Sequence, residues 1–146
     1  MSAEAHGVSR FDALLVQAEM AKGELERLEA IRNLGQYADQ RAIDKLFTIA
    51  FSSGSTLFRR NAIWTLATMD DTNALFALVS IIETNVVPPT DFDKEAILQD
   101  RPSDYSRREA ARALREATFE DFQYDAGKWR HWIMTVGSKL SKAENP

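Results

Sequence analysis

The chain has 146 residues, of which 45% are hydrophobic and 27% are charged, a composition typical of a folded domain rather than a disordered segment. It contains no cysteine, which excludes disulfide bonds, thiolate metal sites and a cysteine nucleophile. The formal net charge of −4 argues against a protein that wraps nucleic acid over its whole surface.

Two helices are predicted near the start of the chain. Apolar residues recur at helical spacing over residues 8–22, and the pattern resumes after Gly23 over residues 24–34. Gly35 follows directly, and we expect it to end the second helix in a left-handed conformation, as glycine commonly does. These two segments form the first predicted antiparallel pair.

Each of the next four predicted helices is preceded by a residue whose side-chain oxygen can cap free backbone N–H groups: Asp39, Ser55, Asp71 and Ser103. The helices expected after these caps cover residues 40–51, 56–68, 72–84 and 104–116. The helix of residues 72–84 is apolar around most of its circumference, which predicts a central position in the fold.

An eight-residue pattern, Arg-x-x-Ala-x-x-x-Leu, occurs three times, at residues 27–34, 59–66 and 107–114. The first two copies lie 32 residues apart, and each is followed by an Asp-x-x-Ala-x-x-x-Leu pattern, at residues 39–46 and 71–78. The third copy comes 48 residues after the second, so we place an insertion at residues 85–102. A fixed period of this size indicates stacked helical repeats, here residues 8–35, 39–68 and 71–116.

A C-terminal cap is predicted at residues 119–140. Its helix, near residues 126–140, carries four apolar residues on one face: Trp129, Trp132, Ile133 and Val136. End units of repeat proteins must cover an exposed core edge, and two tryptophans suit that task.

With Arg27-Leu-Glu-Ala-Ile-Arg-Asn-Leu-Gly35 followed by Asp39 and Ala42, the unit resembles a HEAT repeat, and most closely the short kind named after phycobilisome lyases. The resemblance implies an all-α, right-handed solenoid of three helical pairs plus a C-terminal capping helix. It also implies a structural ladder in which the repeated arginine pairs with an aspartate of a neighbouring repeat: Arg27, Arg59 and Arg107 with Asp39 or Asp71.

Arg32, Trp64 and Arg112 occupy equivalent positions, five residues after each ladder arginine. Since second helices of successive repeats line one surface of a solenoid, we expect these residues to stand in one row and to bind a protein partner, together with Arg115. Tryptophan and arginine are typical of binding hot spots. The alternative is that Trp64 only packs against a neighbouring helix.

Positive charge is concentrated in the second helices, which hold eight of the twelve arginines and six acids. This distribution favours a partner with an acidic surface. We therefore expect a non-catalytic adaptor or assembly factor. Two alternatives stay open from the resemblance: a lyase or chaperone for a bilin-type, cofactor-bearing protein, and a HEAT-like DNA-binding glycosylase.

No phosphate-binding loop, nucleophile elbow or zinc pattern occurs, and the two histidines, His6 and His131, lie far apart. Asp91, Asp93 and Glu95 alternate in the insertion, but the glycine and the final glutamate of a calcium-binding EF-hand loop are missing. We expect no catalytic residue, no cofactor and no metal.

We also expect neither a membrane span nor a signal peptide. The longest apolar run, residues 74–82, is shorter than the roughly 20 residues that cross a bilayer as a helix. The first ten residues lack the apolar core of a signal peptide, so we expect a single cytoplasmic domain of residues 1–146.

Overall fold

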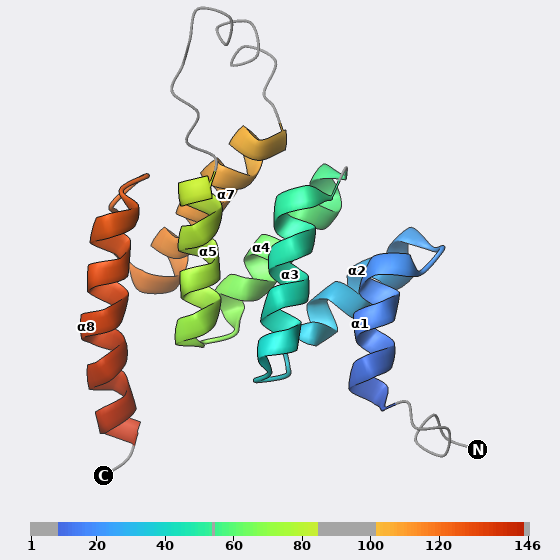
Figure 1. The fold of residues 1–146 in the computed structure, drawn as a ribbon, viewed down its shortest axis with the longest axis horizontal. Helices are drawn as coiled ribbons and strands as arrows, with labels where there is room; N and C mark the ends of the chain where they lie inside the picture. The colour runs from blue at the N-terminus through green and yellow to red at the C-terminus, as the bar shows by residue number, and fades with distance from the viewer. Residues whose placement is uncertain (1–8, 54, 85–101, 145–146) are drawn as a thin grey trace, which may run out of the picture.

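The computed structural model describes residues 9–53, 55–84 and 102–144, and within these ranges the regular secondary structure is entirely α-helical. The helices are α1 (Arg10–Met20), α2 (Glu24–Leu34), α3 (Gln40–Ser52), α4 (Thr56–Thr68), α5 (Thr72–Thr84), α7 (Pro102–Thr118) and α8 (Ala126–Glu144) (Figure 1). None of the described helices is long and apolar enough to cross a membrane.

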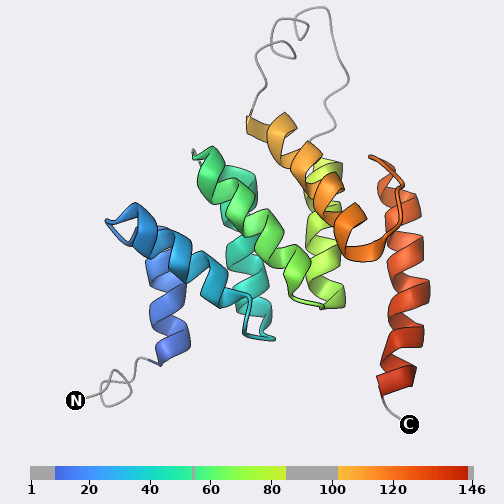
Figure 2. The same cartoon turned by 180° about the vertical axis from the view of Figure 1, so that it is seen from behind.

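The helices form two rows, and together the rows make an all-α solenoid. One row holds α1, α3, α5 and α8, and the other holds α2, α4 and α7 (Figures 1 and 2). Across the rows, α1 packs against α2, α3 against α4, and α5 against α7. Along the second row, α4 contacts both α2 and α7, so the second helices of three pairs lie side by side.

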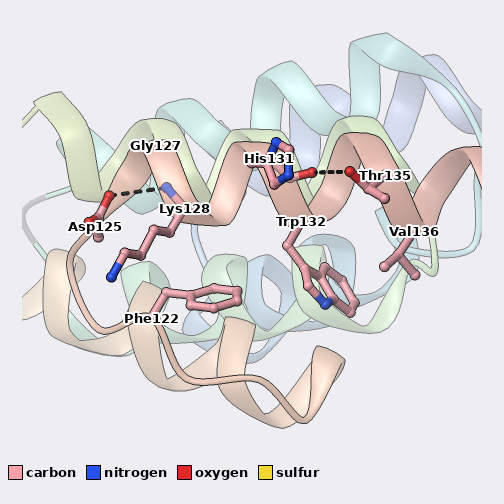
Figure 3. Close-up of a pocket in the computed structure, with 8 residues that line it drawn as sticks. All are labelled: Phe122, Asp125, Gly127, Lys128, His131, Trp132, Thr135 and Val136. Carbon is pink, nitrogen blue, oxygen red and sulfur yellow. Dashed lines mark hydrogen bonds between the residues drawn. The ribbon is translucent and has the colours of Figure 1, made fainter.

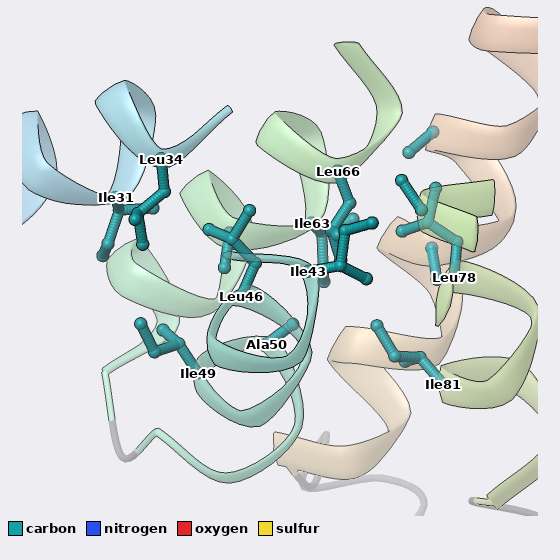
Figure 4. Packing of buried hydrophobic residues seen from close by; sticks show 14 of the residues in the cluster. Ile31, Leu34, Ile43, Leu46, Ile49, Ala50, Ile63, Leu66, Leu78 and Ile81 are labelled. Carbon is teal, nitrogen blue, oxygen red and sulfur yellow. The ribbon is translucent and has the colours of Figure 1, made fainter. Parts of the chain in front are cut away.

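The repeated alanines and leucines build a single continuous core. The alanine of each repeated pattern is fully or almost fully buried: Ala30, Ala42, Ala62, Ala74 and Ala110. The leucine of each pattern is fully buried as well: Leu34, Leu46, Leu66 and Leu78 (Figure 4), and also Leu114. A small alanine allows neighbouring helices to approach closely, and the leucine one turn later fills the space between them, so the sequence period is a packing period.

Three of the four predicted helix caps are present. The side chains of Asp39, Ser55 and Asp71 accept hydrogen bonds from the backbone N–H groups of Arg41, Phe58 and Asn73, at 2.8, 3.3 and 2.7 Å. The fourth prediction is wrong, because α7 begins at Pro102 and Ser103 therefore lies inside the helix. A proline is well suited to the first turn of a helix, where its missing N–H costs nothing. Apart from this proline, the predicted insertion of residues 85–102 lies outside the described residues.

The helix α8 closes the stack, and its direction differs from that of the neighbouring first helix. It packs against α5 but runs antiparallel to it, as both views show (Figures 1 and 2). The connection from α7 contains two residues with positive φ, Phe119 at 62° and Gln123 at 51°, which turn the chain back before α8 begins. Trp129 and Ile133 of α8 are buried, and the Trp129 indole donates to the carbonyl of Gln123 at 2.9 Å. The predicted capping face is therefore divided, because Trp132 and Val136 are only half-buried.

Gly35 is required for a different reason from the one the sequence suggests. Its φ of −65° and ψ of −12° are helical, so the expected left-handed ending is wrong. A Cβ atom at this position would lie 2.7 Å from Cγ2 of Thr65, which is itself buried in α4. The glycine thus permits the end of α2 to touch α4, and the contact is between two repeats.

We predict that Gly35→Ala lowers the free energy of unfolding by about 1–3 kcal/mol, the usual cost of forcing an extra methyl group into a packed core. In a Thr65→Ser background the same substitution should cost less, because the opposing methyl group is gone. Gly127→Ala in α8 is the control, since its nearest neighbour would be 3.5 Å away. Urea unfolding measures all four variants, and equal stability of Gly35→Ala and wild type would contradict the packing argument.

Candidate functional site

The three ladder arginines contact aromatic rings of the next unit. The guanidinium carbon of Arg27 lies 4.1 Å from the ring centroid of Phe58. The corresponding distances are 5.6 Å from Arg59 to Tyr105 and 4.4 Å from Arg107 to Tyr124. We call these three cation–π contacts the arginine rungs, because each joins a second helix to the unit that follows it.

The predicted pairing of these arginines with Asp39 or Asp71 is therefore corrected. Asp39 binds the side chain of Arg41 at 3.1 Å, and this hydrogen-bonded guanidinium lowers the pKa of the Asp39 carboxyl. Asp71 caps α5. Among the described residues, no ion pair links either aspartate to a ladder arginine. The reason is geometric: the arginines lie near the start of second helices, whereas the aspartates cap the start of first helices, at the opposite end of each antiparallel pair.

Arg59 is the most deeply buried rung, with 2% of its surface exposed. Its guanidinium donates to the carbonyl of Ser53 and, at 2.9 Å, to the hydroxyl of Thr56. Its Nε atom has no hydrogen-bond partner in the structure, and the same holds for Nε of Arg107. Among the described residues, neutral oxygens and a ring therefore contact this cation, and no ion pair with a carboxylate is present.

The predicted partner-binding row forms a single site. Residues from α2, α4 and α7 line a hollow of about 590 Å³, which we call the arginine hollow: Arg32, Leu57, Arg60, Asn61, Trp64 and Arg112. Its four α4 residues have the i, i+3, i+4, i+7 spacing of one helix face. Three of the four residues predicted to bind a partner are thus brought together, one from each repeat.

Glu109 of α7 contacts two of the residues that line the hollow, Trp64 and Arg112. It is 8% exposed, accepts the indole N–H of Trp64 at 3.1 Å, and lies 3.6 Å from the guanidinium of Arg112. Nε of Arg32 donates to the side-chain oxygen of Asn61 at 3.1 Å. Trp64 is half-buried, so it both packs against α7 and presents part of its ring to solvent. The ring therefore packs against α7, and binding of a partner by its exposed part stays a prediction.

Positive charge is in excess at the hollow. Arg32, Arg60 and Arg112 line it together, and Arg60 makes no hydrogen bond or ion pair with another described residue. Neighbouring Tyr105 has a raised pKa, mainly because it is partly buried and also because of the negative charge of Glu109. The nearby arginines oppose that shift. The three arginines give the hollow a positive potential, which attracts negatively charged groups.

A family model for HEAT repeats matches residues 12–90, which is more than half of the chain. This chain belongs to the HEAT-repeat family. A search of curated proteins found no significant match, and neither did a search of solved structures. The matched segment includes α2 and α4, whereas α7, the third wall of the arginine hollow, lies after it.

The HEAT-repeat structure places Arg115 away from the hollow. Its guanidinium lies 3.9 Å from Asp121, in the connection to α8. Its position in the repeat corresponds to Gly35 and Ala67, at the ends of the other second helices, and so beyond the row. Sequence analysis missed the contributions of four other residues: Leu57, Arg60, Asn61 and Glu109. The helical spacing of the first three from Trp64 could have identified them.

A second hollow, of about 600 Å³, lies beside α8 and is mostly apolar. Phe122 of the connection and Trp132 of α8 both point into the space between the connection and the helix (Figure 3). Lys128, His131 and Val136 complete much of its wall. Within the described part of the HEAT domain, no three potential metal ligands gather at this hollow or elsewhere.

We predict that Glu109→Ala destabilises the HEAT domain by about 1–3 kcal/mol, because it leaves the Trp64 N–H without its acceptor and Arg112 without its partner. Glu109→Gln should cost less, since its side-chain carbonyl can still accept from the indole. Glu116→Ala, an exposed acid on the same helix, should change stability by less than about 0.5 kcal/mol. Thermal unfolding and the indole N–H chemical shift of Trp64 measure these effects, and equal values for the Ala and Gln variants would argue against the assigned bond.

Proposed function

We propose that this HEAT-repeat protein is a non-catalytic adaptor or assembly factor that holds a protein partner against its row of second helices. HEAT repeats generally act as scaffolds for protein interactions. The observation that carries the proposal is the convergence of Arg32, Trp64 and Arg112, from three different repeats, on one hollow. A site built from all three repeats is available only in the assembled stack.

The composition and order of the hollow support binding. Arginine and tryptophan are enriched among the residues that dominate the free energy of protein association. Glu109 and Asn61 already hold Trp64, Arg112 and Arg32 in place. Side chains that are ordered before binding lose less conformational entropy when a partner arrives.

The charge of the hollow supports a partner with an acidic surface. The chain as a whole carries −4, so a positive hollow is a local exception. A localised positive site attracts an acidic patch, whereas the remaining negative surface disfavours the long continuous charge of a nucleic acid. This contrast supports a protein ligand over the DNA-binding alternative.

The hollow also supports an adaptor over a bilin lyase. A lyase of this kind should present a deep groove lined by several aromatic residues, and Trp64 is the aromatic residue among those that line the arginine hollow. Incubation with a bilin is a direct check, because attachment or tight binding would give the protein visible absorbance.

We predict that the double variant Arg32→Glu/Arg60→Glu loses its partner. The measurement is quantitative crosslinking from native lysate. The amount of protein that crosslinks to α2, α4 or α7 should be at least about tenfold lower for the variant than for the wild type, equivalent to about 1.4 kcal/mol of binding free energy. Both side chains are exposed, so the variant should retain cooperative unfolding.

The matched control is Arg10→Glu/Lys22→Glu, which changes the net charge equally at exposed positions outside the hollow. It should capture the same proteins as wild type. If the hollow variant and the control capture equal amounts, the second-helix row is not the binding face.

A further inference from the structure

Resting on the proposed function, we propose that the arginine hollow receives a short segment of the partner in which a carboxylate side chain stands next to an apolar side chain. The carboxylate lies among Arg32, Arg60 and Arg112, and the apolar side chain lies on Trp64 and Leu57. The segment is therefore a linear acidic and apolar motif rather than a broad acidic surface.

The size of the hollow favours a segment over a folded surface. Its volume of about 590 Å³ is in the range of roughly 300–1,000 Å³ found for pockets that enclose small ligands. Such a space accommodates a few side chains. A folded domain could reach it only by inserting an exposed loop or chain end.

The cationic part of the hollow is prepared for a carboxylate. Arg32 is held by Asn61, and Arg112 by Glu109, so both guanidiniums are oriented before a ligand arrives. Arg60 makes no hydrogen bond or ion pair with a described residue, and its fork of N–H groups is available to a carboxylate. A negative charge on the ligand would lower the excess of positive charge that the three guanidiniums and Glu109 leave.

The apolar part of the hollow follows from the hydrogen bond of Trp64. Because the indole N–H is already donated to Glu109, a ligand meets the ring of Trp64 and not its donor. Leu57, which is 41% exposed, lies on the same face of α4. A half-buried ring beside an exposed leucine leaves apolar surface in water, and an apolar side chain of the ligand would cover that surface. A segment that is only acidic would leave this part uncovered.

A single-stranded nucleic acid is the main competing ligand, because bases stack on tryptophan and phosphates bind arginine. Such strands need a charged groove that continues along the backbone. Here the carboxylate of Glu109 lies beside Trp64 and Arg112, and the chain as a whole is negatively charged. The localised charge therefore favours the peptide, and an oligonucleotide belongs in the test.

The test is a nuclear magnetic resonance titration of the ¹⁵N-labelled full chain with short peptides. The probe is acetyl-Gly-Ser-Glu-Leu-Glu-Ser-Gly-amide. One control replaces both glutamates with glutamine, a second replaces the leucine with serine, and a third ligand is a short oligothymidylate. The readouts are the indole N–H signal of Trp64 and the Nε–H signals of Arg32 and Arg60. The indole signal of Trp129, which is buried and donates to the backbone carbonyl of Gln123, reports whether the fold is intact.

We expect the probe to shift the Trp64 and arginine signals with a millimolar dissociation constant, and both peptide controls to bind at least about tenfold more weakly. Arg60→Glu should abolish the shift while the Trp129 signal stays in place. The inference is overturned if either peptide control binds as well as the probe, or if the oligothymidylate binds more tightly than the probe. It is also overturned if the Trp64 signal does not shift at several millimolar probe, because a dissociation constant in that range corresponds to a binding free energy of about −3 to −4 kcal/mol.

The two proposals can fail separately. If the peptide fails but the crosslinking contrast between the hollow variant and its control persists, the second-helix row binds its partner through another chemistry. If the crosslinking contrast is absent, the adaptor function at this face is excluded even when the peptide binds.

Discussion

Stacking of arginine on aromatic rings is the interaction that joins successive units of this HEAT-repeat protein. The three arginine rungs connect Arg27 to Phe58, Arg59 to Tyr105 and Arg107 to Tyr124. Arginine suits this position because its guanidinium is planar, weakly hydrated and able to stack while its edge donates hydrogen bonds. A carboxylate partner would bring a second desolvation cost into the same space. Within the described ranges, the rungs thus join the units without an ion pair to the rung arginines.

The rungs also determine where the candidate site lies. Arg32, Trp64 and Arg112 each follow a rung arginine by five residues, or about 8 Å along a helix. When the rungs hold α2, α4 and α7 in register, these three side chains are aligned as a consequence, and Glu109 and Asn61 then fix their orientation. Stability and the proposed binding therefore depend on the same alignment of second helices.

The sequence predicts the structural features that recur in each repeat, and it does not predict the contacts and turns that occur only once. Periodic alanines and leucines predict the helices and the core, and equivalent positions predict the row of Arg32, Trp64 and Arg112. The aromatic partners of the rungs do not occupy equivalent repeat positions, so the repeat period does not predict them. Phe58 lies one residue before a ladder arginine, Tyr105 lies two residues before another, and Tyr124 lies in the connection between α7 and α8. The reversed direction of α8 is equally hidden, since its turns use positive φ at Phe119 and Gln123 without a glycine to signal them.

A double-mutant cycle between Arg27 and Phe58 tests the arginine rungs most directly. The variants are Arg27→Met, Phe58→Leu and both together, which retain much of the apolar volume and remove the cation or the ring. Urea unfolding should give a coupling free energy of about 0.5–2 kcal/mol. The same cycle between Arg27 and Trp132, which is in α8 at the far end of the stack, should be additive. A coupling between Arg27 and Phe58 that is indistinguishable from zero would show that the rungs do not hold the repeats together.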